Sequence, residues 1–332
     1  MNIAIVKLSA LGDIVHAMVV LQFIKSFNEK ISIDWVVDEA YKDLLDSCPD
    51  INKVYITKLR RVKKNKSLAL LLSELTKVRK LGPYDIVIDM QGLVKSAIIA
   101  KLIPAKKTIG FDKSSIRERL ASFFYTDKFN CEYSKNVIER NTALIGFALG
   151  LIISKEQIFH KAPFLLPINQ KLDINLFSFK KNILLIPGAS YIAKCYPSSK
   201  FAELTTLIDA NFFVIWGNNK EKIMANEIKE LSSKVNICEK LQLDHLLLLI
   251  SKVDLVIGPD TGPTHISWGM NTPSITLFGP TPGHRNTYET KINRIIESKS
   301  KVNPYKIDKN DYSIKEIDVL EVCKITKELL KK

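Results

Sequence analysis

The chain repeats one pattern twice: a short apolar run ends in a polar or glycine-containing loop, and a longer helical pattern follows. Runs such as residues 86–88 (Ile-Val-Ile) and 254–257 (Asp-Leu-Val-Ile) do not alternate with polar residues, which is typical of strands buried on both faces. Such strands alternating with helices form parallel sheets. A chain of 332 residues is too long for one such core, so we expect two doubly wound, Rossmann-like domains of the α/β class.

The pattern predicts most of the regular structure. In the first half, strands are expected at residues 2–6, 32–37, 53–57 and 85–89, and helices near residues 14–27, 67–80, 93–102 and 135–149. In the second half, strands are expected at residues 182–186, 212–216, 235–238, 254–258 and 274–278, and helices near residues 198–208, 220–232, 243–251 and 265–269. We expect domains at residues 1–160 and 182–312, a linker at 161–181 and an amphipathic helix at 313–332. Doubly wound sheets bind ligands at the carboxyl ends of their strands, so we expect the chemistry in a cleft between two facing domains.

The formal net charge of +14 is unevenly spread, with 26 Lys and Arg against 17 Asp and Glu in residues 1–165. An anionic partner is therefore expected to meet the first half, and charge alone leaves nucleic acid, a phosphorylated substrate or an anionic membrane surface open. The five cysteines form no CxxC pair, which indicates a reducing compartment. Lys7 and Asp13 interrupt any signal peptide, and the longest apolar stretch, residues 144–153, is too short to span a bilayer. We expect a cytoplasmic protein whose membrane contact is peripheral.

The loop after the first strand, residues 7–13 (Lys-Leu-Ser-Ala-Leu-Gly-Asp), places Asp13 beside Gly12 at the start of a helix. With a single glycine it matches neither the dinucleotide fingerprint nor a P-loop. Asp13 suits an N-cap or first-turn acid that the helix dipole favours. It also suits a general base at the mouth of the cleft, and the two roles are compatible.

In the second half, residues 258–265 (Gly-Pro-Asp-Thr-Gly-Pro-Thr-His) lead from a buried strand into a helix. The free N–H groups of Thr261 and Gly262, together with the positive helix end, form a phosphate site. His265 lies one turn further and can touch the same ligand. A capped turn with Asp260 as the cap is the alternative, and the density of Gly, Pro, Asp, Thr and His favours a ligand site.

Two other loops follow strands of the second half. Residues 187–197 can bring Ser190 and Lys194 toward a phosphate, although Lys194 taken alone is also compatible with an ordinary surface lysine. Glu221, just past the strand at 212–216, is placed either to accept hydrogen bonds from the two hydroxyls of a ribose or to serve as a first-turn helix acid.

Residues 58–66 carry six positive charges in nine residues. Most charge runs are simply solvated, but Arg60 and Arg61 directly follow a strand end, and Lys95, Arg117 and Arg140 are expected to add to the same basic surface. Arginine binds phosphate or carboxylate in a bidentate manner. An anionic acceptor held by the first domain would account for both this run and the uneven charge.

Together these segments resemble the lipopolysaccharide heptosyltransferases, which are glycosyltransferases of the two-domain GT-B architecture, over nearly the whole chain. The most specific motifs are Lys7-x-Ser9-x-x-Gly12-Asp13-x-x-His16, Asp89-Met-Gln-Gly-Leu-Val-Lys-Ser96, Asp260-Thr-Gly-x-x-His265 and Phe278-Gly-Pro-Thr281. The second of these motifs is more similar to the heptosyltransferase I branch of the family than to the heptosyltransferase II branch.

The resemblance implies an inverting, metal-independent transfer of heptose from ADP-heptose to a Kdo hydroxyl of Kdo-lipid A, without a cofactor. It implies a monomer at the cytoplasmic face of the inner membrane, with Asp13 as the general base. Glu221 would hold the ribose, Leu241 would pack near the adenine, and Asp260 would orient the heptose hydroxyls. The full implied donor set is Ser190, Lys194, Glu221, Leu241, Asp260, Thr261, Gly262 and His265. The implied acceptor set is Lys7, Ser9, Gly12, Arg60, Arg61, Lys63, Lys64, Gln91, Lys95, Arg117 and Arg140.

Three residues depart from the family pattern: Ala189 stands where a second hydroxyl residue is frequent, Tyr196 stands where Trp is common, and Pro263 removes one N–H from the phosphate loop. The nearest rival is an enzyme of the same architecture with another acceptor or nucleotide sugar, heptosyltransferase II included. A nucleic-acid-binding protein is the rival from another class, and the chain lacks a recognition-helix, RRM or KH signature.

Overall fold

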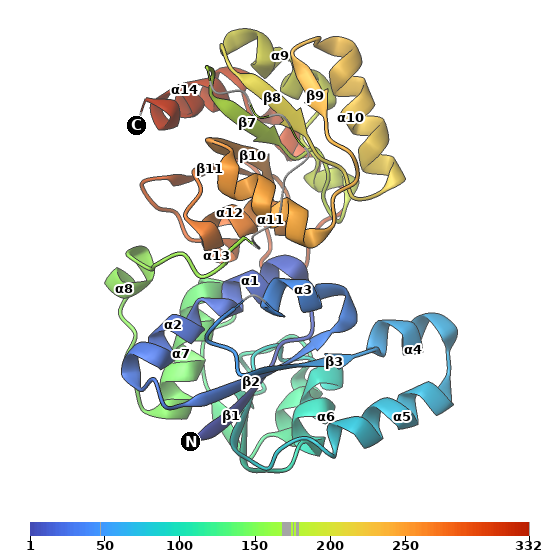
Figure 1. The fold of residues 1–332 in the computed structure, drawn as a ribbon, viewed down its shortest axis with the longest axis vertical. Helices are drawn as coiled ribbons and strands as arrows, with labels where there is room; N and C mark the ends of the chain where they lie inside the picture. Colours follow the sequence, from blue (N-terminus) through green and yellow to red (C-terminus); the bar gives the residue numbers. More distant parts are fainter. Residues whose placement is uncertain (47, 168–173, 175, 177–178, 332) are drawn as a thin grey trace. The chain divides into compact units, whose positions relative to one another are not determined.

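The structure, a computed structural model, describes residues 1–46, 48–167, 174, 176 and 179–331. It divides into two compact units, Met1–Phe164 and Leu165–Lys332, each built on a six-stranded parallel sheet (Figure 1). Residues 168–173, 175, 177 and 178, which belong to the expected linker, lie outside the described residues, as does Lys332 at the end of the expected final helix. No helix within the described ranges is long and apolar enough to cross a bilayer.

The sheet of the first unit has the strand order β3-β2-β1-β4-β5-β6. Its strands are β1 (Asn2–Val6), β2 (Ser32–Asp38), β3 (Lys53–Thr57), β4 (Tyr84–Asp89), β5 (Ala105–Phe111) and β6 (Asp127–Phe129). Its helices are α1 (Leu11–Met18), α2 (Val20–Phe27), α3 (Lys42–Asp46), α4 (Leu59–Asn65), α5 (Leu68–Val78), α6 (Val94–Leu102), α7 (Val137–Leu149) and α8 (Lys155–Phe159).

After its exposed first residue, Asn2, strand β1 is apolar and buried because helices cover both faces of the sheet. Ala4 and Val6 belong to a core cluster with Val78 of α5 and Ile99 of α6. Side chains of successive strand residues point to opposite faces, so the intervening Ile5, which is also fully buried, faces the other side. Helices α1 and α2 both pack against α7, and α7 also packs on β4 and β5.

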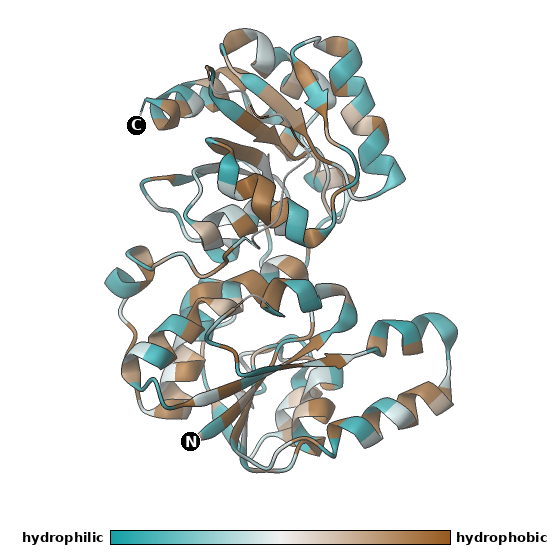
Figure 2. Ribbon diagram, in the orientation of Figure 1, coloured by the Kyte–Doolittle hydropathy of each residue, from teal (hydrophilic) through white to brown (hydrophobic). Residues whose placement is uncertain are grey.

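The second unit repeats this topology with the strand order β12-β11-β10-β7-β8-β9. Its strands are β7 (Asn182–Leu185), β8 (Asn211–Val214), β9 (Val235–Ile237), β10 (Leu255–Pro259), β11 (Ser274–Phe278) and β12 (Asn293–Glu297). Its helices are α9 (Ser198–Leu207), α10 (Asn219–Leu231), α11 (Leu243–Lys252), α12 (Gly262–Met270), α13 (Gly283–Asn286) and α14 (Val319–Leu330). Teal and brown alternate around these helices in Figure 2, as amphipathic helices on a sheet require.

Strand order reverses at the β1/β4 pair of the first unit and at the β7/β10 pair of the second. The loops that leave the carboxyl ends of such a pair run to opposite faces and open a crevice, where doubly wound sheets bind ligands. These four loops contain residues 7–13, 90–93, 186–197 and 260–262. The two-sheet α/β fold predicted from the sequence is therefore confirmed, and three of the loops singled out there lie at a reversal point.

Several element predictions were wrong in detail. The single helix expected at residues 14–27 is two helices, α1 and α2. The final helix begins only at Val319, where Asp318 accepts the N–H of Leu320, and residues 313–316 form a 3-10 turn. Strands β5, β6 and β12 were not expected, because their partly exposed segments mix Lys, Arg and Asp with the apolar residues. The basic run at residues 58–66 contains helix α4.

Candidate active site

The loop after β1 is tied to the segment after β4. The side-chain oxygen of Gln91 accepts the N–H groups of Leu8 and Ser9 at 3.0 and 3.1 Å. The amine of Lys7, which is buried, donates to the carbonyl of Met90 at 2.9 Å. Lys7 and Gln91, both expected to touch an acceptor, therefore connect the two loops at the reversal point of the first sheet.

Asp13 lies in the first turn of α1 and is exposed. Its Oδ2 accepts the N–H of Ala10 at 3.1 Å, which satisfies one of the amides that a helix N-terminus leaves without an intrahelical partner. The local role that the sequence suggested for this acid is thus present. Exposure leaves the carboxylate accessible to a substrate hydroxyl as well.

A fully buried carboxylate organises the neighbouring loop. Asp89 accepts hydrogen bonds from Gln91 N, Ser96 Oγ and Tyr125 Oη at 2.8, 2.9 and 2.8 Å, and from Gly92 N at 3.3 Å. Burial raises the pKa of Asp89, and these donors oppose the shift. In the sequence, Asp89 belongs to a motif but has no predicted role; in the structure, its carboxylate fixes the backbone that presents Gln91.

Tyr41, which was not predicted from the sequence, lies near Arg60 of the basic helix α4 and feels the charge of Asp13. The guanidinium of Arg60 lies 5.8 Å from the centre of the Tyr41 ring. The backbone N–H of Arg60 donates to the carboxylate of Asp38. Burial raises the pKa of Tyr41, Arg60 opposes that shift, and the nearby carboxylates of Asp38 and Asp13 add to it. The charges of Asp13 and Arg60 therefore both act on the Tyr41 hydroxyl. An aromatic at the end of a short helical turn carries no sequence signal for this position.

The remaining cations of the acceptor set occupy different environments. Lys63, Lys64, Lys95 and Arg117 are exposed, and Arg61 pairs with Glu39 while remaining largely exposed. Arg140 does not join this basic surface: it is buried, and its guanidinium donates to the carbonyls of Ser115, Cys131 and Glu132. Through these bonds Arg140 holds the loop before α7 in place. Its guanidinium is therefore not part of the basic acceptor surface.

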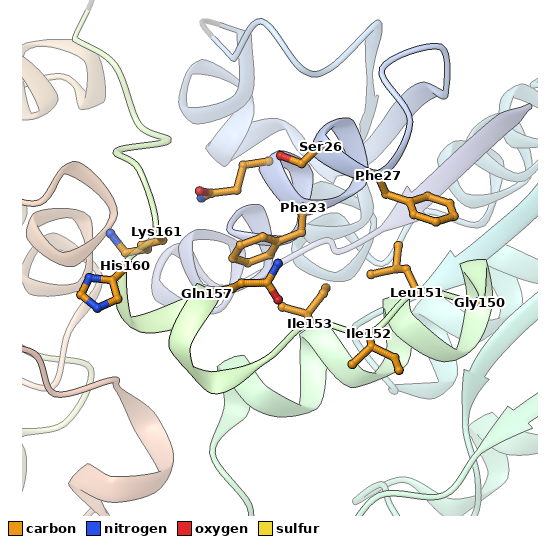
Figure 3. A pocket seen from close by; sticks show the side chains of 11 residues that line it. Phe23, Ser26, Phe27, Gly150, Leu151, Ile152, Ile153, Gln157, His160 and Lys161 are labelled. Carbon is orange, nitrogen blue, oxygen red and sulfur yellow. The ribbon is translucent and has the colours of Figure 1, made fainter.

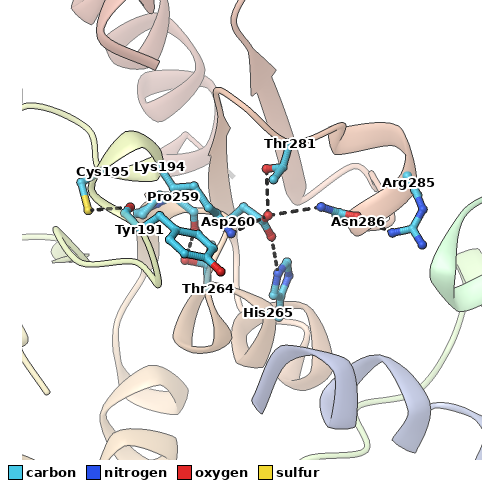
Figure 4. A network of polar contacts seen from close by, with 10 residues as sticks. All are labelled: Tyr191, Lys194, Cys195, Pro259, Asp260, Thr264, His265, Thr281, Arg285 and Asn286. Atoms are coloured by element: carbon cyan, nitrogen blue, oxygen red, sulfur yellow. Dashed lines mark hydrogen bonds and ion pairs between the residues drawn. The ribbon is translucent and has the colours of Figure 1, made fainter. Parts of the chain in front are cut away.

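In the second unit, Asp260 is the centre of a buried polar network (Figure 4). Its Oδ2 lies 2.8 Å from the amine of Lys194, and its Oδ1 lies 2.9 Å from His265 Nε2. Thr281 Oγ1 and Asn286 Nδ2 also donate to Oδ2, at 2.9 and 3.3 Å. Four groups from four separate loops and helices therefore converge on one carboxylate.

Asp260 is 6% exposed, so its environment decides its charge. Burial alone would raise the pKa of this carboxyl, but the charge of Lys194 and the hydrogen bond from His265 outweigh burial and hold the pKa well below its usual range. The carboxylate is ionised and its acceptor positions are engaged. The structure thus presents Asp260 as the anchor of Lys194, whereas the resemblance implied a contact with sugar hydroxyls.

A pocket of about 240 Å³ opens beside this network at the carboxyl ends of β7, β8 and β10. It is lined by Ile186, Gly188, Ile215, Trp216, Gly217, Glu221, Leu241, Leu246, Thr261 and Pro263. Three residues of the implied donor set, Glu221, Leu241 and Thr261, line it. Apolar walls with a few polar groups are typical of pockets that bind small molecules or cofactors.

Glu221 is held in place by its own helix start. Its two carboxylate oxygens accept Gly217 N and Asn218 Nδ2, both at 2.6 Å. Gly188 is required for this arrangement, because a Cβ added there would lie 2.3 Å from Glu221 Cγ. The missing side chain at 188 lets the carboxylate reach the pocket.

Helix α12 begins at Gly262 with Thr261 as its N-cap and Pro263 in its first turn. The first-turn N–H groups of a helix lack intrahelical partners and carry the positive end of the dipole. Thr261 lines the pocket and Asp260, the residue before it, binds Lys194, so a diphosphate seated there would meet amides and an ammonium together. Ser190, from the same implied set, is exposed.

A larger pocket, of about 650 Å³, lies in the first unit and contains none of the implied acceptor residues (Figure 3). Its walls come from α2, from the segment that follows α7, and from α8 with the two residues after it; they include Phe23, Phe27, Ile152 and Lys161. Burial lowers the pKa of Lys161 to about 7. This pocket lies away from the reversal point of the sheet, so we do not assign it to the candidate site.

Solved structures with the same fold include E. coli heptosyltransferase WaaC with ADP, with a TM-score of 0.80 and 24% identity over 99% of this chain and 100% of that chain. The structure of E. coli ADP-heptose lps heptosyltransferase II matches with a TM-score of 0.71 and 20% identity, over 99% of this chain and 98% of that chain. The fold is that of the GT-B glycosyltransferases, as the sequence indicated.

Sequence comparison narrows this class to one family. The model of glycosyltransferase family 9 (heptosyltransferase) matches residues 75–310. Lipopolysaccharide heptosyltransferase 1 of Campylobacter coli is 40% identical over 345 residues, covering 99% of both chains. The protein of that name from Escherichia coli K12 is 27% identical over 290 residues, covering 85% of this chain and 89% of that protein. The chain belongs to glycosyltransferase family 9, the heptosyltransferases, and is a glycosyltransferase.

Proposed function

We propose that this enzyme is heptosyltransferase I, which transfers L-glycero-D-manno-heptose from ADP-heptose to Kdo-lipid A with inversion at the anomeric carbon. The full-length similarity to the Campylobacter coli heptosyltransferase 1 carries the proposal, because it spans both units. The geometry of each unit supports one half of the reaction.

The second unit would hold ADP-heptose. The adenine would occupy the pocket beside Leu241, and Glu221 would accept hydrogen bonds from the ribose hydroxyls. The diphosphate would meet the first-turn amides of α12 and the amine of Lys194. Asp260 would keep that amine oriented through their 2.8 Å contact.

As the bond between the sugar and ADP breaks, negative charge develops on the leaving diphosphate. Lys194 and the end of α12 place positive charge where it develops, and both are preorganised before the reaction begins. This arrangement supplies the stabilisation that a metal ion gives in other transferases, and we propose a metal-independent reaction without a cofactor.

The first unit would supply the base and bind the acceptor. Asp13, exposed at the start of α1, would take the proton from the attacking Kdo hydroxyl. The exposed cations Arg60, Arg61, Lys63 and Lys64 would bind acidic groups of the acceptor, and Gln91 would hold the Asp13 loop in register. We propose that the enzyme acts as a monomer at the cytoplasmic face of the inner membrane, where its lipid acceptor lies.

The test is mass detection of product after the purified protein is mixed with ADP-heptose and Kdo-lipid A. We expect a single added heptose, and with Asp13→Asn we expect product to form about 10²–10⁴ times more slowly. Replacing the acceptor with one that already carries one heptose separates the alternatives, because transfer only to that acceptor would indicate heptosyltransferase II. No transfer, combined with tighter binding of UDP or GDP than of ADP, would refute the donor assignment while leaving the family intact.

A further inference from the structure

Helices α4 and α5 form a hairpin that carries a large share of the positive charge of the chain. Residues 58–80 contain nine Lys and Arg and one acid, Glu74, while the entire chain has a net charge of +14. Figure 1 shows the pair standing out from the sheet of the first unit. Helix α4 buries none of its residues, so its cations face solvent.

The single acid of this hairpin, Glu74, pairs with other residues of the hairpin. Glu74 is buried, accepts the N–H of Lys58 at 2.9 Å, and pairs with the amine of Lys77 at 2.8 Å. Arg61 pairs with Glu39. Within the ranges that the structure describes, no carboxylate forms an ion pair with the remaining cations, which are Lys58, Arg60, Lys63, Lys64, Lys66, Arg79 and Lys80. The outward face of the hairpin is thus almost uniformly positive.

Two large apolar side chains stand beside these charges. Leu68 and Leu72 are 68% and 57% exposed, and their spacing of four residues places them on one face of α5. The turn at Lys66 and Ser67 joins α4 to α5, so the leucines follow the last cations of α4 directly. Figure 2 shows the resulting mixture of hydrophilic and hydrophobic turns on this hairpin.

The acidic groups of the proposed acceptor would account for the cations of α4 but would leave Leu68 and Leu72 in water. A surface that offers negative charge above hydrocarbon matches both, because basic side chains pair with headgroups while apolar side chains enter the boundary beneath them. We propose that the α4–α5 hairpin docks the enzyme on the anionic surface of a lipid bilayer, with Leu68 and Leu72 inserted. The proposal rests on the proposed membrane location of the reaction, and it names the α4–α5 hairpin as the part of the chain that contacts the membrane.

The experiment measures sedimentation of the full chain with vesicles that contain no Kdo-bearing acceptor. One set is phosphatidylglycerol mixed with phosphatidylethanolamine, and the other is phosphatidylcholine. We expect binding only to the anionic set, weakening with salt because exposed charges are screened. L68Q/L72Q should lower the partition coefficient about tenfold, because glutamine keeps helix propensity while it removes the inserted apolar surface.

The matched control is L231Q/L320Q, which changes two leucines of similar exposure, 60% and 62%, on α10 and α14 of the other unit. It should bind vesicles as the unchanged protein does. Equal binding of L68Q/L72Q and the unchanged protein, or equal binding to both vesicle types, would overturn the proposal. So would retention of single-stranded RNA in place of vesicles at the same salt concentration.

Transfer to a deacylated, water-soluble Kdo acceptor separates this proposal from the proposed function. L68Q/L72Q should retain that transfer, since neither leucine belongs to the proposed binding sites. Loss of transfer to the soluble acceptor in L68Q/L72Q would show that the leucines serve the fold or the site, and would refute membrane docking. No transfer by the unchanged protein, together with leucine-dependent vesicle binding, would refute the proposed function and leave the docking surface standing.

Discussion

The Lys194–Asp260 pair allows a quantitative test, because each side chain is more than nine-tenths buried. Asp260→Asn removes the negative charge and leaves the ammonium of Lys194 buried beside a neutral amide. Removing one partner of a buried pair costs about 3–5 kcal/mol. Thr281 and Asn286 also lose a charged acceptor, so we expect the free energy of unfolding to fall by about 4 kcal/mol.

A double-mutant cycle separates the pair from its surroundings. Lys194→Met alone should cost about 3 kcal/mol, because Asp260 then remains buried with His265, Thr281 and Asn286 as its donors. The double variant should cost about as much as one single variant, since it leaves no uncompensated charge. The expected coupling energy is therefore about 3 kcal/mol.

The assay is urea unfolding followed by tryptophan fluorescence in a Trp35→Phe background, which leaves Trp216 and Trp268, both in the second unit, as the reporters. With an m value of about 2 kcal/mol per M, a loss of about 4 kcal/mol moves the midpoint by about 2 M. The folded-state pKa of Asp260 lies well below its unfolded value, so its contribution is complete above about pH 4 and is lost as pH falls through the folded-state pKa. The gap between the unchanged protein and Asp260→Asn should stay constant from pH 7 to pH 5 and narrow below pH 4. Additive losses in the cycle, or a cost of under about 1 kcal/mol for Asp260→Asn, would refute the reasoning.

Three further changes have defined outcomes. Asp13→Asn should lower the turnover number by about 10²–10⁴ while ADP affinity, measured by calorimetry, stays the same, since the proposed ADP pocket belongs to the other unit. A parallel loss of ADP affinity would contradict the proposed role of Asp13 as the base. Gly188→Ala should weaken ADP binding about tenfold, because the new Cβ displaces Glu221; unchanged binding would show that this carboxylate does not contact the nucleotide. Burial lowers the pKa of Lys161 to about 7, so the unfolded chain binds more protons between pH 7 and pH 10. The stability of the unchanged protein relative to Lys161→Met should therefore rise over that range, by at most about 1.4 kcal/mol per pH unit, and urea unfolding at pH 6.5 and 9.5 that gives the same difference would contradict the assignment.

The central strands were predictable from the sequence because burial on both faces leaves an uninterrupted apolar run. Residues 2–6 and 274–278 were predicted with the bounds that the inner strands β1 and β11 have in the structure. The edge strand β3 was also predicted with its bounds, residues 53–57, but from its β-branched and aromatic residues, because it is only partly buried. The outer strands β6 and β12 were missed because partial exposure lets Lys and Arg interrupt that run. Strand β5 was missed for the same reason at its first residues.

The candidate site was predictable where a loop follows a strand at a reversal point, and it was not predictable where partners come from distant segments. Asp260 and Lys194 were each singled out in their own loops, but their contact spans 66 residues of sequence and left no local signal. Thr281 and Asn286 were missed as donors to Asp260 for the same reason, although Thr281 closes a family motif. Arg140 was expected on the surface because a sequence does not show that three carbonyls enclose its guanidinium.

Each unit has its own sheet, reversal point and buried core. The cores are centred on separate sets of residues, such as Val6, Val87 and Ile99 in the first unit and Leu185, Phe212 and Ile257 in the second. Loops at one reversal point can therefore vary without repacking the interior of the other unit. Under the proposed division of labour, acceptor choice and donor choice are separately evolvable. A chimaera that keeps the second unit and replaces the first is the natural route to a transferase that delivers the same sugar to a new acceptor.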